Sequence, residues 1–247
     1  MITFPHFKVT KQPIGLKAST PELEHLIERF FIESRDPRPH TCPSLEKAIQ
    51  KYPDSPTLYN YLYVAYQMQN RTEDATKILQ KTVSRFPDYI FGRVAAAQEA
   101  FNEGMLYMVP RYLGPDIHLH QLYPNKEVFH ESEVLSFYSV AVKYFIKMNQ
   151  LERAEERFEI LKKLNPESEI VQDLGKKLIL LKMRLNAEKN ETDKALREHK
   201  VASFPTVHYA PTDTMPVLAI PEVKLFYSDE DLPKTIGGTL LKKDRAL

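Results

Sequence analysis

Apolar residues recur at helical spacing over most of the first 185 residues. The first such stripe consists of Leu23, Leu26, Ile27 and Phe30. Thr20-Pro21-Glu22 directly precedes it and combines a capping hydroxyl, a proline suited to the first turn and an acidic side chain near the helix start. A later stripe consists of Ile170, Leu174, Leu178, Leu181 and Leu185. These patterns predict an all-α fold for residues 20–200.

Three similar phrases close helical stripes at a regular interval. They read Leu45-Glu-Lys-Ala-Ile-Gln-Lys-Tyr-Pro53, Leu79-Gln-Lys-Thr-Val-Ser-Arg-Phe-Pro87 and Phe158-Glu-Ile-Leu-Lys-Lys-Leu-Asn-Pro166. Pro53 and Pro87 lie 34 residues apart. Because proline ends a helix, the period predicts a recurring pair of helices.

The best-formed repeat lies between residues 56 and 89. Its recurring positions are Tyr59, Leu62, Tyr63, Tyr66, Asn70, Ala75, Leu79 and Pro87. The same spacings return at Tyr138, Ala141, Val142, Phe145, Asn149, Ala154, Phe158 and Pro166. This pattern resembles the tetratricopeptide repeat over about residues 22–185, although a bulky Tyr63 stands where a small residue is usual. The resemblance implies a right-handed helix-pair solenoid of about three to four pairs with a C-terminal capping helix.

The period fails once along the chain. Pro87 and Pro166 are 79 residues apart, which is two periods of 34 plus 11. Prolines and glycines interrupt the expected second helix of the middle pair, so we place an insertion at residues 113–131. We expect it on the loop edge of the solenoid, where loops often carry function.

The resemblance also implies a binding surface. The first helix of each tetratricopeptide pair lines a concave groove, which here places Asn60, Val64, Gln67, Gln98, Phe101, Asn102, Lys143 and Lys147 in that groove. Asn60 and Val64 stand where a lysine and an asparagine would clamp a C-terminal carboxylate. We therefore expect an extended peptide held by backbone hydrogen bonds, and a non-catalytic scaffold or adaptor.

Both ends of the chain are predicted to be non-helical. Residues 1–19 are irregular, with a short extended patch from Ile2 to Val9, and residues 201–247 are an apolar, proline-rich arm. Two alternatives to a simple adaptor follow from this arm. It could drive self-association into a homo-oligomer, or its residues 215–227 could occupy the groove until a partner displaces them.

Composition and motifs give little sign of catalysis. A net charge of +1 argues against a broad nucleic-acid surface, and no apolar run reaches the length of a membrane span, so we expect neither partner and a cytoplasmic protein. The spacing of His118 and His120 could suit a metal, but no second ligand pair supports it. The lone Cys42 is more typical of an incidental residue than of a nucleophile. We expect no cofactor, no metal and no enzymatic activity.

Overall fold

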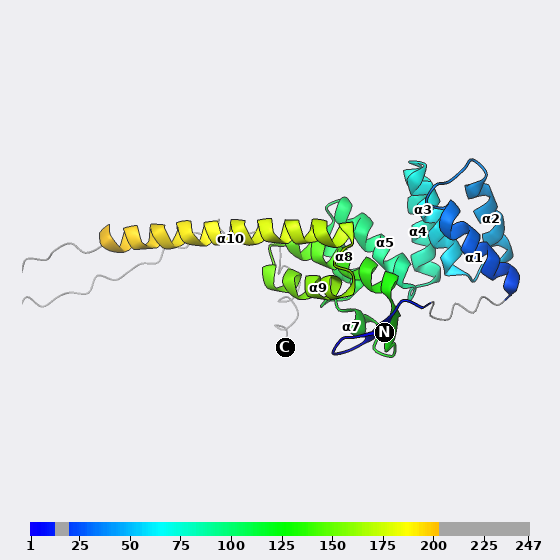
Figure 1. The fold of residues 1–247 in the computed structure, drawn as a ribbon. Helices are drawn as coiled ribbons and strands as arrows, with labels where there is room; N and C mark the ends of the chain where they lie inside the picture. Colours follow the sequence, from blue (N-terminus) through cyan, green and yellow to red (C-terminus); the bar gives the residue numbers. More distant parts are fainter. Residues whose placement is uncertain (13–19, 203–247) are drawn as a thin grey trace, which may run out of the picture. The chain divides into compact units, whose positions relative to one another are not determined.

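The computed structural model describes residues 1–12 and 20–202. The chain divides into two units, Met1–Glu198 and His199–Leu247, and the fold described here is that of the first. This unit is mostly helical, which confirms the coarse prediction of an all-α class (Figure 1). The predicted C-terminal arm lies outside the described residues apart from Val201 and Ala202, which belong to the last helix.

The elements follow one another in a simple order. Two short strands come first, β1 (Ile2–Thr3) and β2 (Lys8–Thr10). The helices that follow are α1 (Pro21–Glu33), α2 (Thr41–Lys51), α3 (Pro56–Met68), α4 (Thr72–Arg85) and α5 (Ile90–Asn102). The middle of the chain holds the 3-10 turn η1 (Leu106–Met108), α6 (Val109–Leu113), α7 (Leu119–Leu122) and β3 (Val128–His130). The last helices are α8 (Glu131–Lys147), α9 (Leu151–Leu164) and α10 (Glu169–Ala202).

Local chemistry accounts for where several helices begin. The hydroxyl of Thr20 accepts a hydrogen bond from the Leu23 amide at 3.3 Å and so caps α1. At the start of α8, the ring Nδ1 of His130 accepts from the Ser132 amide, while the Glu133 carboxylate accepts from the His130 amide. This reciprocal pair satisfies amides that a helix start leaves unpaired.

The turn that ends the first helix of a pair recurs three times. Asn70, Gly104 and Asn149 follow α3, α5 and α8 and all have left-handed backbone, with φ of 56°, 77° and 56°. In each case the next amide bonds a carbonyl five residues back, for example Arg71 N to Tyr66 O at 2.9 Å. Asparagine and glycine adopt this conformation most readily, which explains the residues at these turns.

The helices pack mainly on their neighbours in the chain. Helix α3 contacts α2 and α4, α5 contacts α4, α6 and α8, and α8 contacts α9. Ala75 in α4 and Ala154 in α9 are fully buried, and a small side chain lets two helices approach closely at each place. The buried side chains form two clusters, one within α1–α4 and one that joins the N-terminal segment to α5 and the elements after it.

The insertion is part of the second cluster rather than only a loop on an edge. Leu113, Ile117, Leu119 and Phe129 are at most 1% exposed, so burial of apolar surface holds this segment against the helices. Four large apolar side chains thus join the predicted insertion to the core.

The N-terminal segment packs on this insertion. Strand β2 pairs in parallel with β3, with Val9 opposite Phe129, and β1 pairs antiparallel with β2. Phe4, Phe7 and Val9 are all under 9% exposed. In Figure 1 this segment, in dark blue, lies beside α7. Residues at the start of the chain thus complete a core that the second half of the unit builds.

Candidate functional site

A cleft of about 310 Å³ lies between α3, α5, α8 and the start of α10. Its lining combines apolar side chains with amide, hydroxyl and ammonium groups. The lining residues are Asn60, Tyr63, Phe91, Val94, Ala95, Gln98, Leu135, Ser136, Ser139, Val140, Lys143, Ser168 and Ile170. Such a mixture of apolar walls and a few polar groups is typical of binding sites.

The polar centre of the cleft is a chain of hydrogen bonds from α8 to α5. The Nζ of Lys143 donates to Oε1 of Gln98 at 2.9 Å, and Nε2 of Gln98 donates to Oδ1 of Asn102 at 2.7 Å. The Gln98 amide is therefore oriented with its oxygen toward the lysine. This arrangement leaves the other ammonium hydrogens of Lys143 available to an acceptor in the cleft.

The charge of Lys143 is only weakly compensated. Burial lowers the pKa of its ammonium group, and the nearby cation of Lys177 lowers it further, whereas Asp173 acts in the opposite direction. Asp173 is itself 2.7 Å from the Lys177 ammonium. Within the part of the chain that the structure describes, Lys143 has no carboxylate at ion-pair distance, so an anionic group of a ligand would be favoured there.

A second cluster of polar side chains connects α3 to α5. The Nε2 of Gln67 donates to the Glu99 carboxylate at 3.2 Å, and Tyr63 is hydrogen-bonded to the same carboxylate. Burial raises the pKa of Glu99, and burial together with the Glu99 charge raises the pKa of Tyr63 to about 12. These three side chains tie two helices together on one side of the cleft.

The structure places some of the predicted groove residues in the cleft and others outside it. Asn60, Gln98 and Lys143 lie together in the cleft. Asn102 contacts it through Gln98, and Gln67 lies in the neighbouring polar cluster. Three predicted residues do not line the cleft: Val64, Phe101 and Lys147. Phe101 packs against the core, and Lys147 is exposed.

Several lining residues were not among the predicted ones. Ser168 directly precedes α10 and Ile170 lies in its first turn, and the sequence suggested this helix only as a cap on the last pair. A capping helix must lie beside the helices that it covers, so its first turn could have been expected at the end of the groove. Tyr63 was noticed for its size alone, and its bulk serves as one wall of the cleft.

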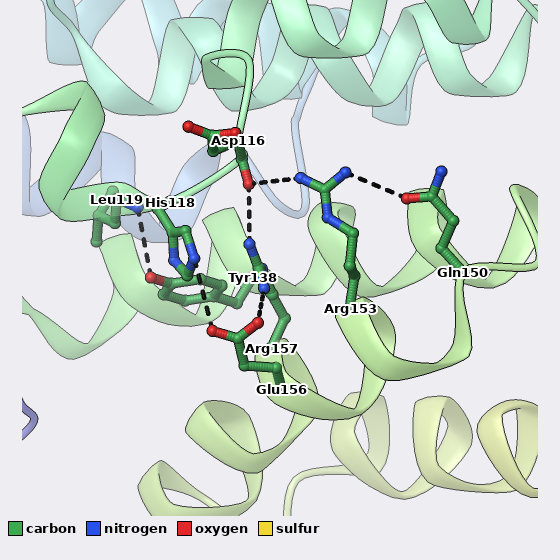
Figure 2. Close-up of polar contacts among 8 residues, drawn as sticks. All are labelled: Asp116, His118, Leu119, Tyr138, Gln150, Arg153, Glu156 and Arg157. Atoms are coloured by element: carbon green, nitrogen blue, oxygen red, sulfur yellow. Dashed lines mark hydrogen bonds and ion pairs between the residues drawn. The ribbon is translucent and has the colours of Figure 1, made fainter.

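A different polar cluster surrounds the carbonyl of Asp116 in the insertion (Figure 2). Nη2 of Arg157 donates to this oxygen at 2.9 Å, and Nη2 of Arg153 donates to it at 3.2 Å. Glu156 pairs with Arg157 and lies 3.6 Å from Nε2 of His118. Arg157 is only 2% exposed, and its interactions there are with protein groups, so this cluster holds the insertion on α9.

The backbone beside this cluster has an unusual conformation. Ile117, which follows Asp116, has a φ of 53° and is 1% exposed. A β-branched residue is costly in the left-handed region and persists there only where surrounding contacts impose it. The two arginines on the preceding carbonyl and the burial of the isoleucine side chain are those contacts.

The remaining candidates are the histidines of the insertion and the lone Cys42. In residues 1–12 and 20–202, no three His, Cys, Asp or Glu side chains are arranged to hold a metal ion. Burial raises the pKa of the Cys42 thiol, which is 1% exposed, and a thiol of this kind is a poor nucleophile. None of the helices in the described residues has both the length and the hydropathy that a membrane span requires.

Comparisons with protein-family models, with curated proteins and with solved structures give no significant match to this chain.

Proposed function

We propose that this chain is a non-catalytic interaction module that binds an extended segment of a protein partner in the cleft between α3, α5 and α8. The helix pairs would act as a scaffold of the tetratricopeptide type. The observation that carries the proposal is the half-buried ammonium of Lys143, whose hydrogen-bond partner is the amide of Gln98.

The partner segment should contain an acidic residue. A carboxylate in the cleft could accept a hydrogen bond from Lys143, and such charge-assisted bonds are roughly twice as strong as neutral ones. Asp173 cannot supply this group fully, because it already pairs with Lys177. The charged form of Lys143 is destabilised by burial, and a carboxylate of the ligand would compensate for the water that this ammonium has lost.

The same segment should also carry an apolar side chain. Phe91, Val94 and Leu135 line the cleft beside the polar centre. The amide of Asn60 and the hydroxyls of Ser136 and Ser139 offer hydrogen bonds to a peptide backbone. An extended chain with an acidic residue close to an apolar one matches both features.

Peptide display on the full chain tests this function. Random peptides would be selected on the immobilised wild-type protein, and the enriched peptides synthesised and measured by fluorescence anisotropy. We expect enriched peptides with an acidic residue near an apolar one. Their affinity should fall by about tenfold or more for Lys143→Met, because the charge-assisted bond is lost.

Lys147→Met is the matched control for this experiment. Lys147 lies on the same helix, one turn further on, and is exposed outside the cleft. Its replacement removes the same charge and should leave the affinity within about twofold. Selection of no peptide, or equal binding by the wild type and the Lys143 variant, would reject the cleft as the binding site.

Self-association is a second candidate, favoured by one face of α10. Ile179, Leu180 and Met183 are 61%, 65% and 63% exposed and fall within little more than one helical turn. A terminal helix usually presents a polar outer face, so this apolar one suggests contact with another chain. Sedimentation velocity of the full chain should show an oligomer that Leu180→Lys dissociates. A monomer at all concentrations would exclude this candidate.

A further inference from the structure

The N-terminal arm, residues 1–12, contacts the insertion through two groups of rings, in addition to the pairing of β2 with β3 and an ion pair between Lys11 and Glu131. The first is apolar. The ring of Phe7 lies edge-on to Phe129 at 5.6 Å between centroids and is stacked on Tyr138 at 6.4 Å. The paired strands add backbone contacts, including a hydrogen bond from the Lys8 amide to the Glu127 carbonyl at 2.8 Å, and the Lys163 ammonium donates to the Thr3 carbonyl at 3.1 Å.

The second contact is a row of three imidazole rings. His6 of the arm is stacked on His120 of α7, with ring centroids 4.4 Å apart. His118 lies 5.1 Å from His120 on the other side. His118 and His120 are half-buried, whereas His6 is exposed. Stacking of this kind is favourable for neutral rings and unfavourable for two charged ones.

Charged groups of both signs surround these rings. Burial lowers the pKa of His118, Arg157 lowers it further, then His120, while Glu156 and Asp116 act in the opposite direction. Burial likewise lowers the pKa of His120, and so do His6 and Arg157. Glu156 is the carboxylate nearest to His118, and it also pairs with Arg157.

We propose that the N-terminal arm is a releasable segment: it stays on the insertion while His118 and His120 are neutral, and their protonation detaches it. Each proton that is added places a positive charge beside another imidazole and near Arg157. Detachment of the arm separates His6 from His120, which removes the repulsion between these two rings and exposes the His120 ring to water.

The direction of the pH effect follows from the two lowered pKa values. The detached state binds a proton at His120 more readily than the docked state, because burial and His6, which lower the pKa of His120 below 6.5, act on it less once the arm has left. Docking of the arm is therefore fully favourable above about pH 6.5. It weakens as the pH falls from 6.5 toward the lower pKa of His120 in the docked state. The arm should remain in place at neutral pH and be released under mildly acidic conditions.

Amide hydrogen exchange of the full chain tests the release. Protection factors, which correct for the intrinsic effect of pH, would be measured for Lys8, Val9 and Val128 to His130 at about pH 7.5 and about pH 5.5. We expect protection at these amides to fall by about tenfold at the lower pH, while amides of α3 and α4 keep theirs. Unchanged protection of the arm would overturn the proposal.

The variant His6→Gln/His118→Gln/His120→Gln separates imidazole charge from other effects of acid. Glutamine keeps polarity and cannot be protonated, so protection of the arm should no longer depend on pH. His25→Gln, at an exposed position of α1, is the matched control and should behave as the wild type. Equal loss of protection in the triple variant would assign the release to other groups.

If the triple variant has no ordered arm at pH 7.5, the single variant His120→Gln is measured instead. Protection of its arm should depend less on pH than in the wild type, and an unchanged dependence would also reject the proposal.

Discussion

Lys143 on α8 donates a hydrogen bond to Oε1 of Gln98 on α5 over 2.9 Å, across the cleft that both residues line. The pair joins two helices that are 45 residues apart at this point in the chain. A neutral amide satisfies one ammonium hydrogen without neutralising the charge. The cleft thus keeps a cation in a partly desolvated position, and this has consequences for stability as well as for binding.

The first prediction concerns the pH dependence of stability at Lys143. Burial keeps its folded pKa below the ordinary value of 10.5, so the folded state holds this proton less tightly than the unfolded state does. The free energy of unfolding of the wild type should therefore gain a contribution as the pH rises through the folded pKa toward 10.5. Lys143→Met lacks this gain and should differ from the wild type by about 1 kcal/mol or less at neutral pH.

Urea unfolding at several values between about pH 7 and about pH 9.5 measures this difference. The upper limit matters because Tyr63, with a pKa raised to about 12, and other buried tyrosines begin to oppose the gain at higher pH. Lys147→Met removes an exposed ammonium from the same helix and serves as the reference. Parallel curves for the two variants would contradict the prediction.

The second prediction compares the two aromatic rings that meet where the arm docks. Phe129 is fully buried in the insertion, and Phe7 is 6% exposed in the arm. Phe129→Ala should lower the free energy of unfolding by about 3–5 kcal/mol, as is usual for a large core residue. Phe7→Ala should cost less, because the arm can detach and the loss cannot exceed the free energy that docks it.

Chemical denaturation of both variants, with hydrogen exchange of the arm, checks this order. Phe7→Ala should lose protection at β1 and β2 and keep it in α8. A larger loss of global stability for Phe7→Ala than for Phe129→Ala would show that the arm does not detach separately. Met68→Ala, at an exposed position, provides a control for the loss of apolar atoms alone.

The third prediction concerns the carboxylate that starts α8. Glu133 accepts a hydrogen bond from the His130 amide at 2.9 Å and bonds the Lys126 ammonium at 2.7 and 2.9 Å. Glu133→Ala removes the cap and the ion pair and should cost about 1–2 kcal/mol. Glu133→Gln keeps an acceptor for the amide and should lose less than half of that. Thermal unfolding of the two variants distinguishes them, and an equal loss in both would assign the effect to charge.

Local sequence rules predicted the helical pairs well because their signals are local. The prolines, the left-handed turns at Asn70 and Asn149, and the small Ala75 and Ala154 each act over a few residues. The break in the period predicted an insertion at residues 113–131. Its packing could not be predicted, since the burial of Phe129 depends on Phe7, which lies 122 positions earlier.

The cleft shows the same limit in another form. Asn60, Gln98 and Lys143 were expected on one surface from their place in the repeat, and the structure brings them to one cleft. Whether a side chain at such a position points into a cleft depends on the neighbouring helices. Phe101 instead packs against the core, and Ile170 enters the lining from a helix whose placement no repeat register gives.

The fourth prediction concerns the two arginines that share one carbonyl. Arg153 and Arg157 both donate to the backbone oxygen of Asp116, at 3.2 and 2.9 Å, and both lie over the ring of Phe145. A single Met substitution leaves the oxygen with one donor and keeps an apolar side chain over the ring. Arg153→Met and Arg157→Met should therefore each cost about 1–2 kcal/mol.

The double variant should be less stable than the sum of the two single changes indicates. It leaves the Asp116 oxygen without either donor, next to Ile117, whose left-handed backbone has a φ of 53° and depends on that contact. Urea unfolding of the four proteins gives the coupling free energy, which we expect to be about 1 kcal/mol. Additive losses would mean that the two arginines stabilise the insertion independently, through Phe145 and Glu156 rather than through the shared carbonyl.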